Sequence, residues 1–324
     1  MPILRTLEQI GAPVERLSKQ ARMPLDVVRE CRGVIGEFSL WKFIEISAKR
    51  EGYHNLGYDC AQSGLITTVA ELGGFRMRLA PTLKVILEYF IEDIRSESTS
   101  TFYSLRYGTD AAWFHRVPPF GKHNASWQAE QYIIAVIIQI IRICADPGWL
   151  PTHIHVNSVD KPQKLPDEWS DINVAWGCEA TEIRIPNMVM ASPPTAVRRT
   201  FSNSADKETG IQGSTLQFVD LVESQIRTGR FGFENTAEEL GLSKTTLKRK
   251  LGSMETSYSE IVEQVRFDLA RQMLLNTEVP ISEIAIDLGY RHPANFSRAF
   301  KRISGLSPIT YRLGMFTSDH TESV

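Results

Sequence analysis

The stretch "ANFSRAFKR" at residues 294–302 places two phenylalanines four positions apart and surrounds them with three cations. Side chains at positions i and i+4 of a helix lie on the same face. Phe296 and Phe300 are therefore expected to enter a hydrophobic core, while the cations point outward. The segment predicts a helix that is held down by its rings and presents a cationic surface to a partner.

An earlier segment repeats this pattern. "AEELGLSKTTLKRKL" (237–251) and "AIDLGYRHPANFSRAF" (285–300) share a small alanine, a leucine, a glycine and a later apolar pair. Alanine lets two helices cross closely, and a glycine with φ > 0 ends one helix so that the next begins at a steep angle. The repeat predicts two helix-turn-helix units, each with a second helix that fits the DNA major groove. The matched positions are Ala237, Leu240, Gly241, Leu247 and Leu251, and then Ala285, Leu288, Gly289, Phe296 and Phe300.

The segment between the two copies, "YSEIVEQVRFDLARQMLL" (258–275), has apolar residues at helical spacing. One continuous helix of this length spans about 27 Å at 1.5 Å per residue. Such a helix would hold the two units near one turn of DNA apart, which is about 34 Å. We therefore predict that the two second helices enter successive major grooves on the same face of the DNA.

The charge of the chain is distributed unevenly. A net charge of −2 gives no general reason to expect a polyanionic partner. Two short segments differ from this average, because residues 243–250 and 291–302 each contain four cations and no acid. These segments coincide with the second helices of the two predicted units. The sequence therefore predicts local binding to phosphates and bases rather than a generally basic protein.

These segments of the chain resemble a known family. "ISEIAIDLGYRHPANFSRAFKRISGLSPITYR" (281–312) resembles the signature of the AraC/XylS transcription regulators, and the likeness extends back through "LGLSKTTLKRKL". The stretches "GGFRMRLAPTLKVILEYF", "WLPTHIHV" and "IPNMVMASPP" resemble the arabinose-binding-like regulatory domain of that family. The resemblance implies two helix-turn-helix units joined by a long helix, double-stranded DNA and RNA polymerase as partners, transcription activation, and control by a small-molecule effector.

Site residues follow from the resemblance together with the helical spacing. Arginine can donate two parallel hydrogen bonds to guanine, which favours Arg249 and Arg298 as base contacts, whereas lysine is a less directional cation. Each of these cations has a phosphate contact or a solvated surface charge as its alternative, and Ser243 has a plain N-cap role as its alternative. The base-contacting candidates are Lys244, Thr245, Lys248, Arg249, Ala294, Asn295, Ser297 and Arg298. The phosphate-contacting candidates are Ser243, Lys250, Lys301 and Arg302.

Two positions depart from the family pattern. Glu255 stands where the family often has glycine after the first DNA-contacting helix, and Ile303 stands where an aromatic residue is expected. Neither residue is a proposed DNA contact. The departures therefore bear on local turn geometry and not on function.

The chain is long enough for two domains, since its 324 residues exceed the size at which single cores stop growing. The prediction is a mixed α+β regulatory domain at 1–192, a linker at 193–213, an all-α DNA-binding domain at 214–314 and a tail at 315–324. Helices are expected near 4–20, 25–33, 38–50, 82–98 and 126–144, followed after the linker by 215–227, 235–241, 243–252, 257–275, 281–288 and 293–303. Strands are expected within 100–117, 152–158 and 180–186.

Several other kinds of protein are disfavoured. The most apolar run, "YIIAVIIQIIRICA" (132–145), is shorter than the roughly 20 residues that span a bilayer. With no basic segment before an apolar stretch at the N-terminus, the sequence predicts a cytoplasmic chain with reduced cysteines and no membrane contact. His153 and His155 share one face of a predicted strand, but no third ligand lies near them in sequence. We therefore expect no metal and no other cofactor.

Two alternative functions remain open at this stage. An enzyme fused to a DNA-binding module would need a nucleophile, for which Cys60 in "GYDCAQSG" is the nearest candidate. A sequence-indifferent architectural protein would bind scrambled DNA equally well. The N-terminal part would bind a small effector or a second copy of the chain. Aromatic residues such as Tyr103, Trp113 and Trp176 are candidates for lining an effector pocket, with core filling as the alternative.

Overall fold

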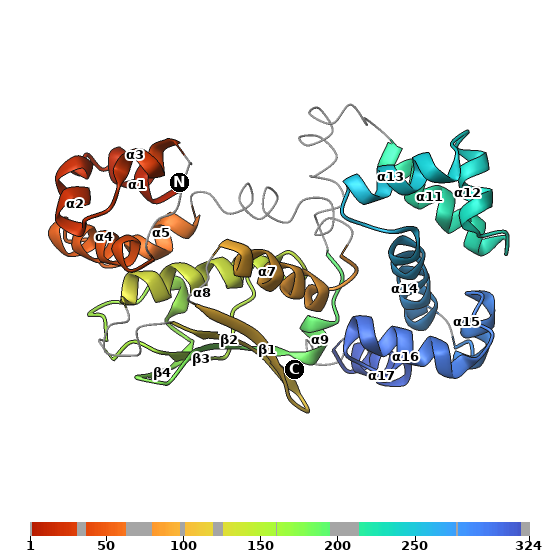
Figure 1. Cartoon of the computed structure of the whole chain (residues 1–324). Coiled ribbons are helices and arrows are strands. Elements are labelled where there is room, and N and C mark those ends of the chain that lie inside the picture. Colours follow the sequence, from red (N-terminus) through yellow and green to blue (C-terminus); the bar gives the residue numbers. More distant parts are fainter. Residues whose placement is uncertain are drawn as a thin grey trace. The chain divides into compact units, whose positions relative to one another are not determined.

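The computed structural model describes residues 2–30, 37–62, 80–97, 101–118, 126–159, 161–194, 214–276 and 278–318. These residues form two compact units (Figure 1). The N-terminal unit contains the elements from α1 to β5, apart from the first turns of α7. The C-terminal unit contains those first turns, α9, and every element from α11 onward. Most of the predicted linker lies outside the described residues, so its boundaries stay a prediction.

Short helices open the N-terminal unit, and they correct the expected single helix at 4–20. Gly11 has a φ of 73° and Pro13 lacks a backbone N–H, so the chain turns between them and two helices form. Their apolar faces pack with later helices around buried residues such as Leu7, Leu17 and Phe43. The helices are α1 (Pro2–Gln9), α2 (Val14–Ala21), α3 (Leu25–Glu30), α4 (Glu37–Arg50) and α5 (Leu56–Gln62), the last of which was not predicted.

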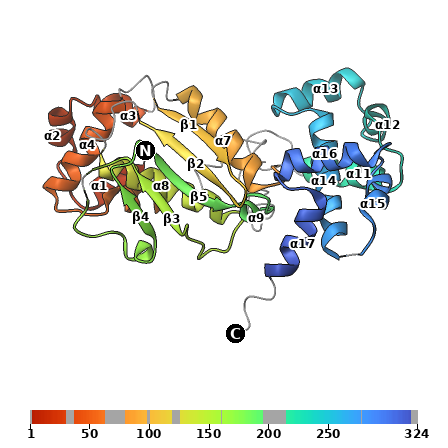
Figure 2. The ribbon, with the colours of Figure 1, turned by 90° about the horizontal axis from the view of Figure 1, so that it is seen from below.

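A five-stranded sheet forms the rest of the N-terminal unit, with the strand order β1-β2-β5-β3-β4 (Figure 2). The predicted hairpin is present, since β1 and β2 pair antiparallel and the Gly108 N–H donates to the Ala111 carbonyl at 2.9 Å. β5 pairs antiparallel with both β2 and β3, whereas β3 and β4 are parallel. The strands are β1 (Phe102–Tyr107), β2 (Ala111–Val117), β3 (His153–Val156), β4 (Asn173–Trp176) and β5 (Thr181–Pro186).

Two longer helices accompany the sheet: α7 (Leu83–Glu97) precedes β1, and α8 (Trp127–Arg142) lies in sequence between β2 and β3. Side chains alternate between the two faces of a strand, so β2 directs Phe114 and Arg116 to one face. Arg116 forms a buried ion pair with Glu130 of α8, and Thr181 of β5 donates to the same carboxylate. The α8 segment is therefore a buried helix that packs on the sheet. Within the described residues, no helix is both long and apolar enough to cross a membrane.

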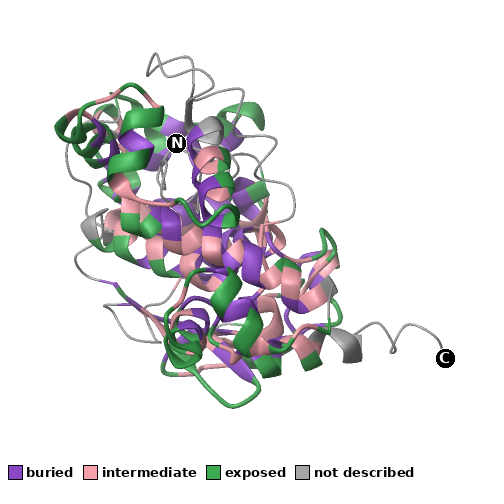
Figure 3. Ribbon diagram, turned by 90° about the vertical axis from the view of Figure 1, so that its right-hand side faces the viewer, coloured by how far each residue is buried: buried purple, intermediate pink, exposed green. Residues whose placement is uncertain are grey.

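The C-terminal unit is helical, and its core contains both apolar pairs of the repeat. Buried and exposed positions alternate along the helices (Figure 3). The predicted helices of this region are present, and a further helix, α17, follows them and extends into the predicted tail. The elements are α9 (Asn187–Met190), α11 (Ser214–Arg227), α12 (Phe233–Glu239), α13 (Lys244–Ser253), α14 (Tyr258–Asn276), α15 (Ile281–Asp287), α16 (Pro293–Ser304) and α17 (Pro308–Ser318).

Candidate nucleic-acid interface

The two copies of the repeat have the same backbone turn. Gly241 between α12 and α13 has a φ of 64°, and Gly289 between α15 and α16 has a φ of 77°. Glycine adopts this left-handed conformation without steric cost, so it can end the first helix of each pair. Ala237 and Ala285 are 2% and 0% exposed, as expected for the small residues at a close crossing.

The second helix of each pair is anchored by its apolar pair. Leu247 and Leu251 of α13 are buried, and so are Phe296 and Phe300 of α16. The Phe300 ring lies 4.9 Å from the ring of Phe267 on α14, measured between centroids. Burying the rings fixes the rotation of each helix about its axis, and this rotation decides which side chains face outward.

The outward face of α13 carries the candidates of the first copy. Lys244, Thr245, Lys248, Arg249 and Lys250 are all exposed. Positions 244 and 248 share one face of the helix, and positions 245 and 249 share a neighbouring one. No acidic residue lies within α13. The helix therefore presents a cationic surface opposite its buried leucines.

Ser243 begins α13 as its N-cap. Its side-chain oxygen accepts a hydrogen bond from the backbone N–H of Thr246 at 3.1 Å. This bond satisfies one of the free N–H groups of the first turn, so the capping role is present. Contact of Ser243 with a phosphate remains a prediction. Such a contact would use the exposed first turn of the same helix.

Lys244 has an acidic partner on the preceding helix. Its Nζ lies 2.7 Å from Oε1 of Glu234, and this hydrogen bond lowers the pKa of the Glu234 carboxyl. Both side chains are more than 60% exposed, so solvent screens the pair and it contributes little to stability. The pair orients Lys244, and DNA can replace Glu234 as the partner of Lys244 at little cost.

The candidates of the second copy are on α16. Ala294, Asn295 and Arg298 are exposed, whereas Ser297 is half-buried. The Arg298 Nη2 donates to Oδ1 of Asn295 at 2.7 Å, and its Nε donates to the Ala294 carbonyl at 3.4 Å. Asn295 thus holds the guanidinium against its own helix, on the surface of the fold. Arg298 is exposed, as predicted, and Asn295 positions its guanidinium.

The two phosphate candidates at the end of α16 differ from each other. Lys301 is exposed and forms no ion pair within the described part of the chain. Arg302 pairs with Glu263 of α14, and its side chain is 63% exposed. A phosphate would therefore compete with Glu263 for Arg302 but would meet no such competitor at Lys301.

A bridge between the two helix pairs was not predicted from sequence. The Arg266 guanidinium of α14 lies 4.5 Å from the centre of the Phe231 ring and 4.9 Å from that of Tyr290. Phe231 precedes α12, and Tyr290 follows the turn glycine of the second pair. Arg266 Nη2 also donates to the Gly289 carbonyl at 3.4 Å. One side chain of the central helix therefore contacts both helix pairs.

The packing around Arg266 also explains why the second turn contains a glycine. A Cβ on Gly289 would lie 2.9 Å from Cε1 of Phe231 and 3.2 Å from Nη2 of Arg266. Gly289 thus has a packing reason in addition to its positive φ. A sequence signal for this bridge did exist, because an arginine in the middle of a mostly apolar helix face needs a partner.

Glu255 lies in a turn with unusual backbone geometry. Its φ is 54°, which is the left-handed region that L residues with a Cβ adopt at a cost. Of the described residues other than glycine, only Arg22 and Glu255 have positive φ. The family glycine at this position therefore has a conformational reason, and this chain tolerates glutamate in the same turn.

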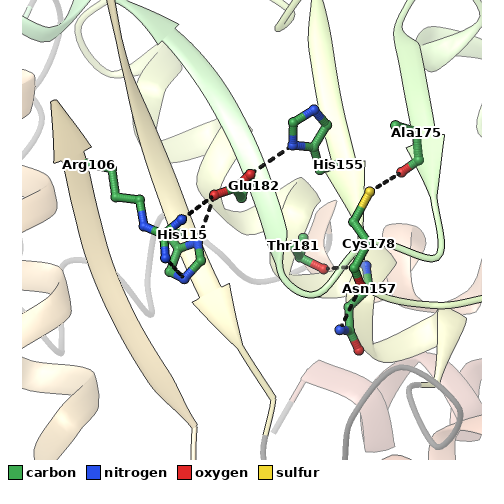
Figure 4. Close-up of polar contacts among 8 residues, drawn as sticks. All are labelled: Arg106, His115, His155, Asn157, Ala175, Cys178, Thr181 and Glu182. Atoms are coloured by element: carbon green, nitrogen blue, oxygen red, sulfur yellow. Dashed lines mark hydrogen bonds and ion pairs between the residues drawn. The ribbon is translucent and has the colours of Figure 1, made fainter. Parts of the chain in front are cut away.

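The N-terminal unit has a polar cluster on the sheet face opposite Arg116 (Figure 4). His115 Nδ1 and His155 Nδ1 lie 2.8 and 2.7 Å from the two carboxylate oxygens of Glu182, and Arg106 lies 3.2 Å from Oε1. Hydrogen bonds from the histidines lower the pKa of Glu182 against the opposing effect of its burial. His155 also stacks on Trp113, with ring centres 4.9 Å apart.

These contacts give His155 a packed role on the strand face. His153 instead lies beside the Thr152 hydroxyl and is exposed. Among the described residues, no group of three side chains is arranged to hold a metal ion. The two histidines of "HIH" therefore do not converge on a common site.

The aromatic candidates for an effector pocket also lie apart. Tyr103 is 3% exposed and packs on Phe114, while Trp113 lies on the opposite face with His155. Trp176 packs on Trp127, with ring centres 5.0 Å apart. These three residues fill separate places and do not enclose one cavity.

Cys60, the candidate nucleophile of the enzyme alternative, is fully buried. Burial raises the pKa of its thiol to about 11, so that almost none of it is thiolate at neutral pH. Cys60, Cys144 and Cys178 form no disulfide bond, and Cys31 lies outside the described residues. Cys60 is therefore not an activated nucleophile.

Comparison with known proteins gives the same assignment to the C-terminal region. Residues 236–314 match the family model described as a helix-turn-helix domain. The ornithine utilization regulator of Pseudomonas aeruginosa is 41% identical over 87 residues, which are 26% of this chain and 26% of that regulator. The porin thermoregulatory protein EnvY of Escherichia coli is 41% identical over 75 residues, or 23% of this chain and 30% of its own length.

Solved structures also match this region. The C-terminal domain of AraT, a response regulator from Geobacillus stearothermophilus, is 31% identical, with a TM-score of 0.29. The match covers 31% of this chain and 83% of that one. The chain covers less than a third of the length of these two curated relatives. The transcriptional regulator CdpR of Pseudomonas aeruginosa matches 96% of this chain and 96% of its own length at 18% identity, with a TM-score of 0.39.

Proposed function

We propose that this chain is a sequence-specific DNA-binding transcription regulator of the AraC type, since residues 236–314 match a helix-turn-helix domain and similar chains are regulators. Its two helix pairs act as two reading units, with α13 in one major groove and α16 in the next. The observation that carries the proposal is the matched construction of the two pairs. Each has a left-handed glycine turn, a buried apolar pair and an exposed second helix that contains no acid.

The chemistry of contact divides between the candidates. Arg249 and Arg298 each donate two hydrogen bonds to a guanine, and the hydroxyl and amide groups of Thr245 and Asn295 bind neighbouring base edges. Ala294 offers apolar contact to a thymine methyl. Lys244 and Lys248 add less directional donors, and Ser297 lies at the edge of the surface. This division makes base preference depend mainly on arginine.

Phosphate contacts position the two helices. Lys250 and Lys301 are exposed cations that can neutralise phosphates, and Ser243 offers the first turn of α13. Arg302 can contribute after exchanging Glu263 for a phosphate, at a cost of about 0–1 kcal/mol. These contacts carry no sequence information but supply affinity that decreases with salt.

The N-terminal unit would control this activity. We propose that a small effector, or a second copy of the chain, binds there and favours the DNA-competent state, which requires different affinities for two states. Activation through RNA polymerase is part of the same proposal. A regulatory role without enzymatic activity agrees with the regulators among the relatives and with the buried, protonated thiol of Cys60.

The test combines footprinting with two substitutions. Footprinting on the DNA upstream of the chain's own coding region would first identify a site. Arg298→Ala should relax preference at one base pair by about 1–3 kcal/mol, because a two-bond contact to guanine is lost. Lys301→Ala should weaken binding to every sequence equally and reduce the slope of log affinity against log salt by about one.

Fluorescence anisotropy with the identified site, single-base variants and a scrambled duplex gives both quantities. Uniform loss of affinity in both variants would show that Arg298 does not contact a base directly. Equal affinity of the unmodified chain for the site and the scrambled duplex would favour the architectural, sequence-indifferent protein instead.

A further inference from the structure

Arg298 uses one edge of its guanidinium to bind its own helix. Its Nε donates to the Ala294 carbonyl at 3.4 Å, and its Nη2 donates to Oδ1 of Asn295 at 2.7 Å. Nε and Nη2 lie on the same side of the planar guanidinium group. The edge between Nη1 and Nη2 therefore keeps two parallel N–H groups, and this arrangement matches the N7 and O6 acceptors of guanine.

The same hydrogen bond fixes the amide of Asn295. A guanidinium carries only donors, so the side-chain oxygen of Asn295 faces Arg298 and the nitrogen points away from it. The amide nitrogen has no hydrogen-bond partner within the described residues. The second lone pair of the oxygen lies next to a cation, which disfavours the approach of a further positively polarised donor. Asn295 therefore offers DNA mainly a donor.

The surroundings of this pair on α16 add no strong acceptor. Residues 291–302 contain no acidic side chain. Glu263, which reaches the end of this helix from α14, is paired with Arg302. Ala294 is apolar, and the Ser297 side chain, whose hydroxyl can donate or accept, is half-buried. Arg298 and Asn295 together therefore present an outward surface of donors.

The hydrogen bond also restricts Arg298 before DNA is bound. Ordering a long arginine side chain on binding costs conformational entropy. Asn295 lies three positions before Arg298, on the same face of the helix, and already limits the positions of the guanidinium. Less of the entropy cost then remains when DNA binds. Asn295 is thus a positioning residue for Arg298 as well as a donor.

From this geometry we propose that Asn295 is a specificity-determining residue that selects guanine over adenine, an inference that rests on the proposed function. An asparagine with a free amide reads adenine, because its oxygen accepts from N6 and its nitrogen donates to N7. In this chain the oxygen is held by a cation, so the adenine amino group is disfavoured. The amide nitrogen donates instead to N7 or O6 of a guanine. The DNA element read by α16 then contains two neighbouring G·C pairs, one for Arg298 and one for Asn295.

The first test measures the base preference of the unmodified full chain. Each of the four base pairs would be placed at the two neighbouring positions of the site found by footprinting, and affinity would be measured by fluorescence anisotropy. The pair contacted by Asn295 is the one at which Asn295→Ala relaxes the preference. We expect guanine to be favoured over adenine there by about fivefold or more, from about one hydrogen bond to a base edge.

Analogues of guanine check that the contact lies in the major groove. Inosine keeps N7 and O6 and should bind like guanine, whereas 7-deazaguanine lacks N7 and should bind more weakly at the pair of Arg298. A preference for adenine at the pair of Asn295 would overturn the inference and leave the proposed function standing. Equal affinity for every sequence would overturn both.

A substitution reverses the hydrogen-bonding character of Asn295. Asn295→Asp keeps an oxygen towards Arg298 but replaces the donor with an acceptor, so its preference should change from guanine to cytosine, whose N4 donates. Gln272→Glu is the matched control, because it makes the same change from amide to carboxylate at an exposed position of α14 outside the DNA candidates. It should leave base preference unchanged. An unaltered preference for guanine in Asn295→Asp would contradict the assigned donor.

A double-mutant cycle tests the positioning role. Asn295→Ala removes the group that holds Arg298, and it should reduce discrimination at the guanine of Arg298 by about 2- to 10-fold. In the Arg298→Ala background the same substitution should have no further effect at that base pair. Equal weakening of binding to every sequence by Asn295→Ala would show a purely structural role and would overturn the positioning.

Discussion

At the scale of single residues, exposure follows directly from helical spacing. Arg298 is exposed because it lies two positions from Phe296 and two from Phe300, both of which are buried. The sequence therefore sufficed to predict that its guanidinium lies on the surface. The hydrogen bond from Arg298 to Asn295 was not predicted, because it depends on a rotamer that spacing does not determine.

Helical spacing also does not predict the partners of Arg266. Its partners, Phe231 and Tyr290, come from segments far apart in the chain, so no local pattern brings them together. Buried polar partners are decided by tertiary packing, and this is where the sequence was least informative.

Glu255 gives a prediction at the residue scale. Replacing it with glycine should stabilise the C-terminal unit by about 0.5–1 kcal/mol, since glycine removes the roughly 1–2 kcal/mol cost of the left-handed conformation but loses more entropy on folding. For a domain of about 100 residues the midpoint of unfolding should rise by roughly 2–8 °C in calorimetry.

The control for Glu255→Gly places glycine in a helical backbone. Gln272 is exposed in α14, where glycine costs about 1 kcal/mol relative to good helix formers. Gln272→Gly should therefore lower the midpoint. A fall in the midpoint for Glu255→Gly as well would show that the glutamate side chain makes a stabilising contact that outweighs the backbone cost.

At the scale of elements, long periodic segments were predicted well, whereas some of the short ones were missed. α14 and α16 match the predicted helices to within a few residues because their apolar positions repeat over several turns. β4 has four residues, which is too short for alternation to distinguish it from a loop. α17 had an available signal, since Ser307 precedes Pro308 and its hydroxyl accepts the Thr310 N–H at 3.1 Å.

Coupling between the two helix pairs gives the prediction at this scale. Arg266→Met keeps a long side chain but removes the contacts of the cation with both rings and the bond to Gly289. We expect affinity for a full two-element DNA site to fall by roughly 3- to 30-fold, from a cation–π contribution of about 0.5–2 kcal/mol. Affinity for either half-element alone should change little, because each second helix keeps its own core.

Arg227→Met is the matched control for Arg266→Met. Arg227 is an exposed residue at the end of α11, paired only with Glu223 among the contacts described here, and is not a DNA candidate. It should leave binding to the full site unchanged. An equal loss on the full site and on the half-elements in Arg266→Met would mean that Arg266 supports folding or contacts DNA and does not couple the pairs.

At the scale of the whole molecule, composition alone was a poor guide to function. The net charge of −2 conceals the cations of α13 and α16, which are grouped on two outward faces. Their grouping follows from burying one face of each helix in a shared core. The repeat and the grouping together carried the functional inference, whereas the N-terminal unit offered mixed strands and helices with no motif that located an effector site.

The central claim is that α13 and α16 occupy successive major grooves at a fixed separation. Binding to the identified site with five base pairs inserted between its two half-elements tests this most directly, because half a turn moves one element to the opposite face of the duplex. The account predicts that affinity for the inserted site falls to that for a single half-element. Affinity that is unchanged by the insertion would contradict it.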